Sequence, residues 1–99
     1  MFDKLASVEA RFMEVEARLG DPALADRPDE FRKLSREHAS LQEIVSEYRR
    51  YKSIKSEIAS NKELVYESDA EISQMAKDEL KRLEPELESV TQNLQVLLL

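Results

Sequence analysis

Apolar residues recur in steps of three and four along most of this 99-residue chain, and this periodicity decides what the chain can fold into. Such steps keep side chains on one face of an α-helix, whereas a half-buried strand needs strict alternation. The chain has only one glycine and three prolines, so it is poor in the residues that make β-turns. Its many Ala, Glu, Leu, Lys and Arg residues are strong helix formers. The sequence therefore predicts an all-α fold.

The first apolar row predicts a helix over residues 2–19. Its members are Leu5, Val8, Phe12, Val15 and Leu19. We expect Gly20 to take the left-handed conformation that ends many helices, and Pro22 cannot continue the helix. Asp21 and Pro22 together predict one short helical turn, with Asp21 as its cap. Leu24 should pack this turn against the core.

The second row predicts a helix over residues 29–65, opened by Pro28 and about 55 Å long. Its members are Phe31, Leu34, His38, Leu41, Val45 and Tyr48. A slightly rotated stripe continues through Ile44, Tyr51, Ile54 and Ile58. Such rotation is expected where a 3.6-residue helix is not held to a strict heptad.

The third row predicts a helix over residues 69–97, which Ser68 and Glu71 should open as a capping box. Its members are Ile72, Ala76, Leu80, Leu83, Leu87, Val90, Leu94 and Leu97, with Met75 widening its early part. Pro85 lies inside this helix. We expect a kink near Pro85 and not two helices, because the apolar row crosses the proline without changing phase.

Short links between long helices make sequential neighbours antiparallel. We therefore expect a single domain over residues 1–99, an elongated antiparallel three-helix bundle or coiled-coil-like hairpin in which the first helix covers only part of the second. The apolar ending, residues 96–99, suggests a truncated chain whose last leucines pack on something beyond it. No apolar run is long enough to span a membrane and no secretory signal opens the sequence, which favours the cytoplasm.

The residues offer little for catalysis or ligand binding. There is no cysteine, and Gly20 stands alone where a phosphate-binding loop needs several glycines. His38 is the one histidine, and a half-buried place in the helical seam is favoured over a role as general base or metal ligand. The carboxylates fall at solvent positions of helices, not in a pocket. We therefore expect a non-enzyme with no metal, cofactor or small-molecule ligand.

Charge is unevenly spread along the chain. The net charge is −6, made of −4 over residues 1–30, +4 over 31–62 and −6 over 63–99. The densest basic cluster is interleaved with Tyr48 and Tyr51, and a weaker basic surface precedes it. The cluster comprises Arg49, Arg50, Lys52 and Lys55, and the weaker surface comprises Arg32, Lys33 and Arg36. Both are candidates for contact with RNA phosphates. The alternative, favoured by the acidic flanks, is a surface paired with acids of the neighbouring helices.

Four segments, in order along the whole chain, resemble the start of bacterial class-I peptide chain release factors. They are Leu19-Gly20-Asp21-Pro22, residues 31–41 with Leu-Ser-Arg-Glu-His-Ala, Met75-Ala76-Lys77-Asp78-Glu79-Leu80, and residues 94–99. Each segment alone is weak, but four in register are fairly specific. The Leu-Ser-Arg-Glu and Leu-Leu-Leu segments are closer to the type that reads UAA and UAG than to the other type.

The resemblance implies the N-terminal helical domain of a protein that acts in translation termination. In the family this domain faces the stalk base and GTPase-associated region of the ribosome, with its rRNA, and is implicated in interplay with the class-II release factor, a GTPase. The family releases peptides through a Gly-Gly-Gln motif and reads stop codons through a Pro-x-Thr loop. Neither motif occurs in this sequence. The chain therefore resembles one non-catalytic domain of the family only.

Two other interpretations remain open at this stage. A free-standing coiled-coil adaptor or scaffold would use exposed apolar stripes to bind other helices. An RNA-gripping arm of an enzyme such as a tRNA synthetase would bind RNA through residues 49–55 with steep salt dependence. The net charge of −6 weighs against the arm.

Overall fold

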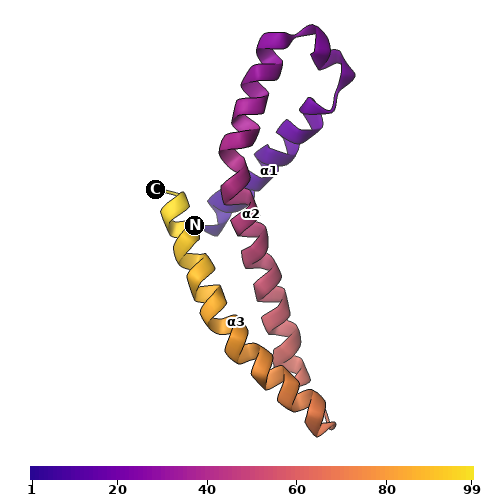
Figure 1. Ribbon diagram of the computed structural model, residues 1–99, viewed down its shortest axis with the longest axis vertical. Coiled ribbons are helices and arrows are strands. Elements are labelled where there is room, and N and C mark those ends of the chain that lie inside the picture. The colour runs from indigo at the N-terminus through magenta and orange to yellow at the C-terminus, as the bar shows by residue number, and fades with distance from the viewer. The chain divides into compact units, whose positions relative to one another are not determined.

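The computed structural model describes residues 1–99 as three α-helices joined by short turns (Figure 1). The elements are α1 (Phe2–Leu19), the 3₁₀ turn η1 (Pro22–Asp26), α2 (Pro28–Leu64) and α3 (Ala70–Leu97). No strand is present, so the all-α prediction is confirmed. The three predicted helix ranges differ from the observed bounds by at most one residue at any end. None of the helices combines the length and the apolar character needed to cross a membrane.

The chain divides into two compact units, unit 1 (Met1–Ser46) and unit 2 (Glu47–Leu99). Unit 1 pairs α1 with the first part of α2, and unit 2 pairs the later part of α2 with α3 (Figure 1). Each pair is antiparallel, as the short connections predicted. The expectation that the first helix covers only part of the second is confirmed, since α1 belongs wholly to unit 1.

The core of unit 1 extends into its turn. Leu5, Phe12 and Val15 of α1 are buried, and Val15 clusters with Leu24 of η1 and Leu34 of α2. The predicted helical turn and the packing of Leu24 are both confirmed. A buried Leu or Val side chain contributes about 1.5–3 kcal/mol relative to an exposed one, so this cluster fastens the turn to both helices.

Polar contacts at the end of α1 differ in part from the prediction. Asp21 does cap η1, because its Oδ1 accepts a hydrogen bond from the Ala23 N–H at 3.0 Å. Gly20, however, lies in the right-handed region at φ −85° and ψ −4°, so the predicted left-handed conformation is wrong. The N–H groups of Gly20 and Asp21 bond the carbonyls of Glu16 and Arg18 without it. The last turn of α1 thus needs no positive φ to satisfy its carbonyls.

The core of unit 2 is a stripe along α3 that packs with α2. Four residues of α3 and two of α2 are buried. They are Ala76, Leu83, Val90 and Leu94, with Ile54 and Ile58. On α2, Leu34, Ile44 and Val45 are buried in unit 1 and Ile54 and Ile58 in unit 2, so the division between the two helix pairs does not follow the two predicted rows.

Three residues placed in the predicted rows are not core residues. Phe31 in the first turn of α2, Ile72 in the first turn of α3 and Met75 one turn later are all exposed. Helical periodicity alone extends a row to the end of its helix. It does not reveal where the facing helix stops covering that row.

The start of α3 corrects a second local prediction. Its N-cap is Asp69 and not Ser68, because Asp69 Oδ1 accepts from the N–H groups of Glu71 at 2.9 Å and Ile72 at 3.4 Å. A carboxylate suits the positive end of the helix dipole and satisfies two orphan donors at once. The Ser73 hydroxyl also donates to the Val65 carbonyl at 2.7 Å, which closes the α2–α3 turn.

Proline does not divide α3. The helix runs through Pro85 without interruption, so the expectation of one helix and not two is confirmed. Pro85 is exposed, while Leu83 and Val90 on either side of it are buried. The apolar row therefore passes the proline in phase. The kink near Pro85 stays a prediction.

Candidate functional site

The seven basic residues predicted to contact RNA all lie on α2 and divide between the two units. Arg32, Lys33 and Arg36 belong to unit 1, and Arg49, Arg50, Lys52 and Lys55 belong to unit 2. All seven side chains are exposed. Their surroundings differ strongly.

Arg50 joins the two helices of unit 2. Its guanidinium pairs with Glu47 of α2 at 3.3 Å and with Glu86 of α3 at 3.0 Å. The hydrogen bond that Arg50 donates to Glu86 raises the pKa of Arg50, and the one that it donates to Glu47 adds to the effect. Asn93 Nδ2 donates to Glu47 at 3.2 Å and extends the same network. Arg50 therefore matches the alternative expectation, a basic residue paired with acids of the neighbouring helix.

The rest of the unit 2 cluster is partly engaged. The Lys52 ammonium lies 4.6 Å from the centre of the Tyr48 ring, a cation–π distance. Tyr48 and Tyr51 are half-buried, and one face of the Tyr48 ring is covered by Lys52. Arg49 also takes part in an interaction within the chain. Lys55 is exposed and makes no ion pair, so its charge is available to a partner.

In the weaker basic surface of unit 1, too, some residues are engaged within the chain and others are not. Arg32 pairs with Asp29 one turn earlier on α2. The charge of Lys33 contributes to the lowered pKa of Glu37. Arg36 is exposed and makes no ion pair. Of the seven predicted residues, Arg36 and Lys55 thus keep their charges most fully available, one in each unit.

Unit 1 has its own ion pair between helices, which sequence reasoning missed. Arg11 of α1 binds Glu37 of α2 through two hydrogen bonds, from Nε at 2.6 Å and from Nη2 at 2.8 Å. This bidentate contact raises the pKa of Arg11 and lowers the pKa of Glu37. Both residues belong to stretches whose net charge is opposite to their own, so a count of charge by region could not reveal them.

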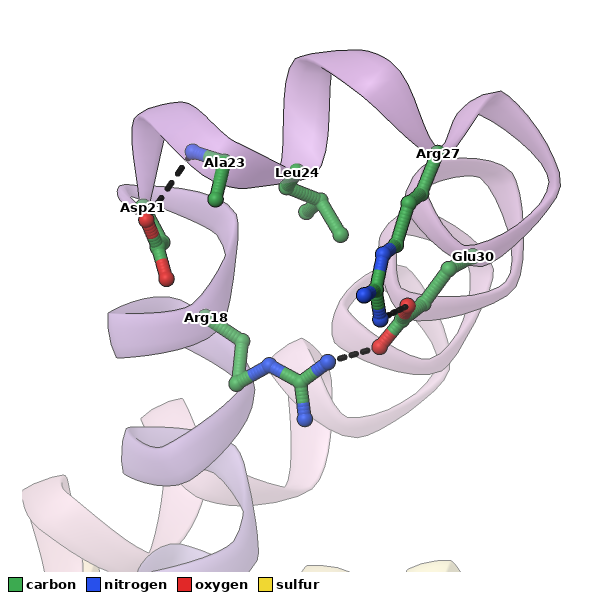
Figure 2. A pocket seen from close by; sticks show the side chains of 6 residues that line it. All are labelled: Arg18, Asp21, Ala23, Leu24, Arg27 and Glu30. Atoms are coloured by element: carbon green, nitrogen blue, oxygen red, sulfur yellow. Dashed lines mark hydrogen bonds and ion pairs between the residues drawn. The ribbon is translucent and has the colours of Figure 1, made fainter.

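A polar cavity of about 240 Å³ lies at the turn of unit 1, among α1, η1 and the start of α2 (Figure 2). Figure 2 shows Arg18 and Arg27 reaching from either side toward the carboxylate of Glu30. Arg27 Nη1 lies 3.5 Å from Glu30, and Arg18 pairs with the other oxygen. The charged groups in this cavity therefore satisfy one another, which makes it part of the turn's architecture.

His38 lies in the seam of unit 1. Its ring stacks on Phe12 with centroids 4.4 Å apart and an interplanar angle of 24°. Its Nε2 lies 3.8 Å from Glu16 Oε1, and the side chain is half-buried. This is the position that the periodicity favoured for His38. An aromatic stack with one carboxylate at its edge gives a polar side chain a stable place in a helical interface.

The structure is a helical module built of two helix pairs, a capped turn and a charged α2. Sequence comparison identifies the family to which this module belongs. The chain belongs to the PCRF domain family, whose model matches residues 8–99. The relatives are proteins named peptide chain release factor 1. Those of Pelobacter propionicus, Geotalea uraniireducens and Nitratidesulfovibrio vulgaris are 48%, 43% and 41% identical to it over 99 residues.

Each of these matches covers the whole of this chain but only 27% or 28% of the relative. The chain thus spans about a quarter of the length of the curated relatives it matches. None of the solved structures matches it. The resemblance to class-I release factors expected from four short segments is therefore confirmed, and it extends over the full chain.

Proposed function

We propose that this chain is the ribosome-facing domain of a peptide chain release factor that acts in stop-codon-dependent translation termination. The observation that carries the proposal is the match to release factor 1 over all 99 residues, at up to 48% identity. The same relatives favour the UAA/UAG-reading type. The place of action is then the cytoplasm, where ribosomes terminate translation.

The domain's part in this function is binding and not chemistry. Every charged side chain is at least partly exposed, and no polar or charged residue is buried. Acid–base catalysis depends on carboxylates whose surroundings push their pKa values apart inside a site. Here the perturbed carboxylates, Glu37 and Glu79, are surface groups held low by Arg11 and Arg82. Such pairs support a structural role for these groups.

The partners we propose are the stalk-base and GTPase-associated region of the ribosome with its rRNA, and the class-II release factor GTPase. Lys55 and Arg36 support an rRNA contact, since they are exposed and carry charges that no acid of the chain neutralises. Phosphate contacts position a protein on RNA without reading sequence. The two residues therefore serve orientation on the ribosome.

The first test is the reading frame that encodes this chain. Sequencing past Leu99 should reveal a continuation with Gly-Gly-Gln and Pro-x-Thr motifs. A frame that ends at Leu99 would reject the release-factor domain and favour the coiled-coil adaptor. This result does not depend on how well the isolated chain folds or binds.

The second test is co-sedimentation of the 99-residue chain with bacterial ribosomes. The double variant Arg36→Glu/Lys55→Glu should weaken association and reduce its dependence on salt, because two phosphate contacts are lost. Lys81→Glu, an exposed lysine of α3, is the matched control and should bind as the unmodified chain does. Circular dichroism should show equal helicity for all three. Unchanged binding of the double variant would reject α2, at Arg36 and Lys55, as part of the ribosome contact.

A further inference from the structure

The turn of unit 2 exposes four large apolar side chains, which we call the apolar tip. They are Leu64 at the end of α2, Tyr66 in the turn, and Ile72 and Met75 at the start of α3, exposed by 39%, 89%, 40% and 62%. Four exposed large hydrophobic residues within 12 positions form a patch, whereas single ones are ordinary on a protein surface.

The apolar tip is hollowed. A cavity of about 170 Å³ is lined by Asn61, Leu64, Ile72, Met75, Ala76 and Glu79. Ile72, Met75, Ala76 and Glu79 follow helical spacing, so they present one face of α3 toward the end of α2. Of the lining residues, only Asn61 and Glu79 have polar side chains. Such a cavity suits an apolar side chain and offers few hydrogen bonds to a polar ligand.

The backbone around the cavity is held in place. Ser73 bonds the Val65 carbonyl at 2.7 Å, and Asp69 accepts from two N–H groups of α3. Asn61 Nδ2 also donates to the Glu57 carbonyl at 2.9 Å. A preformed cavity costs a ligand less ordering entropy than one that must first be assembled.

The charges around the apolar tip are mostly negative. Residues 61–79 contain six acidic side chains against two basic ones, Lys62 and Lys77. The acids are Glu63, Glu67, Asp69, Glu71, Asp78 and Glu79. Glu79 pairs with Arg82, and Asp69 is used as a cap. Glu63, Glu67 and Glu71 have no ion pair within the chain, so their charges act on whatever covers the tip.

We propose that the apolar tip docks a basic amphipathic segment of another protein, with an apolar side chain in the cavity and Lys or Arg residues against the acidic rim. Charge complementarity selects this occupant. RNA and anionic lipid would be repelled by the rim. A second copy of the chain would bring two acidic rims together. The proposal goes beyond the role in termination and does not rest on it.

The test uses a synthetic amphipathic helix made only of leucine and lysine as the probe. Titrated into the ¹⁵N-labelled 99-residue chain, it should shift amide signals of residues 61–79 first, and its affinity should fall with added salt. A leucine–glutamate helix of the same pattern should not bind. Shifts centred elsewhere on the chain would overturn the proposal.

Met75→Glu and Met13→Glu are a matched pair of variants. The two methionines are 62% and 59% exposed, and Met13 belongs to unit 1 whereas the apolar tip belongs to unit 2. Met75→Glu should weaken binding of the leucine–lysine helix by about tenfold, as expected for a contact at the centre of an interface. Met13→Glu should leave the affinity unchanged. Equal losses in both variants would show non-specific attraction and reject the site.

The double variant Glu67→Lys/Glu71→Lys tests the rim separately. It should lose affinity for the leucine–lysine helix and gain affinity for the leucine–glutamate helix. Sedimentation velocity should show one monomeric species for the unmodified chain across its concentration range. Self-association abolished by Met75→Glu would reject the protein partner in favour of a second copy. Binding of an RNA oligonucleotide at residues 61–79 would reject it in favour of RNA.

Discussion

The two helix pairs close their ends in opposite ways. Unit 1 turns through η1 and buries Leu24 against Val15 and Leu34. Unit 2 turns within a few residues and leaves Leu64 and Tyr66 exposed. The first turn uses its apolar residue to stabilise its own fold. The second holds its apolar residues outward on a fixed backbone, which is costly in water unless something else covers them.

The ion pairs between helices also differ in their direction. In unit 1 the arginine comes from α1 and the acid from α2, as Arg11 and Glu37. In unit 2 the arginine comes from α2 and the acid from α3, as Arg50 and Glu86. One long helix thus supplies the acid to one partner and the base to the other. This opposite polarity favours pairing of each part of α2 with its own helix.

The largest loss of stability should come from a substitution in the core of unit 2, which also tests whether the two units unfold separately. Leu83→Ala removes a fully buried side chain and should cost about 2–5 kcal/mol of the free energy of unfolding. Urea unfolding followed by circular dichroism measures the loss. Amide hydrogen exchange then shows whether unit 1 keeps its protection. Equal loss of protection in both units would mean that they unfold as one.

The two turns can be compared directly. Leu24→Ala should cost about 2 kcal/mol, near the low end for a buried leucine because the turn lies at the end of the unit. Tyr66→Ala in the other turn should change stability by less than about 0.5 kcal/mol, since the ring is exposed. Thermal unfolding of both variants measures the difference. Similar losses would contradict the contrast between a packed turn and an open one.

The cap of α3 offers a smaller test. Asp69→Ala should destabilise the chain by about 1 kcal/mol, because two N–H groups lose their acceptor. Ser68→Ala is the control and should be nearly neutral. The urea midpoint of each variant is sufficient to separate them. A larger loss for Ser68→Ala would restore the capping box predicted from the sequence.

The smallest effect concerns pH. Arg11 lowers the pKa of Glu37 below the ordinary 4.5, so this carboxylate contributes stability that is present above that value and lost as pH falls through the folded-state pKa. Glu37→Gln should remove this part of the pH dependence. The stability at pH values below the folded-state pKa of Glu37 should stay unchanged. Carboxyl NMR titration of Glu37 measures the pKa directly. An ordinary pKa would show that the pair contributes nothing in solution.

Helix bounds and topology could be read from the sequence because periodicity, Pro22, Pro28 and the short links act locally along the chain. The seam position of His38 followed from the same periodicity. Gly20 and Ser68 were misjudged because several residues compete to satisfy a helix end. Pairing of Arg50 with an acid of the neighbouring helix was one of the two interpretations of the basic cluster, but its partner Glu86 and the pair of Arg11 with Glu37 were out of reach, since an ion pair between helices depends on which side chains face each other. Ile72 and Met75 were expected in the core because periodicity does not reveal where the facing helix stops covering a row.

Pro85 has a consequence for how unit 2 opens. Because proline has no N–H, the carbonyl of Lys81 receives no hydrogen bond from it, and α3 has a gap in its ladder at that point. Opening motions tend to begin where a helix holds fewest internal bonds. We therefore expect the half of α3 that carries Met75 and the half that carries Val90 to differ in how readily they open. Fraying of the C-terminal half need not disturb the cavity near Met75.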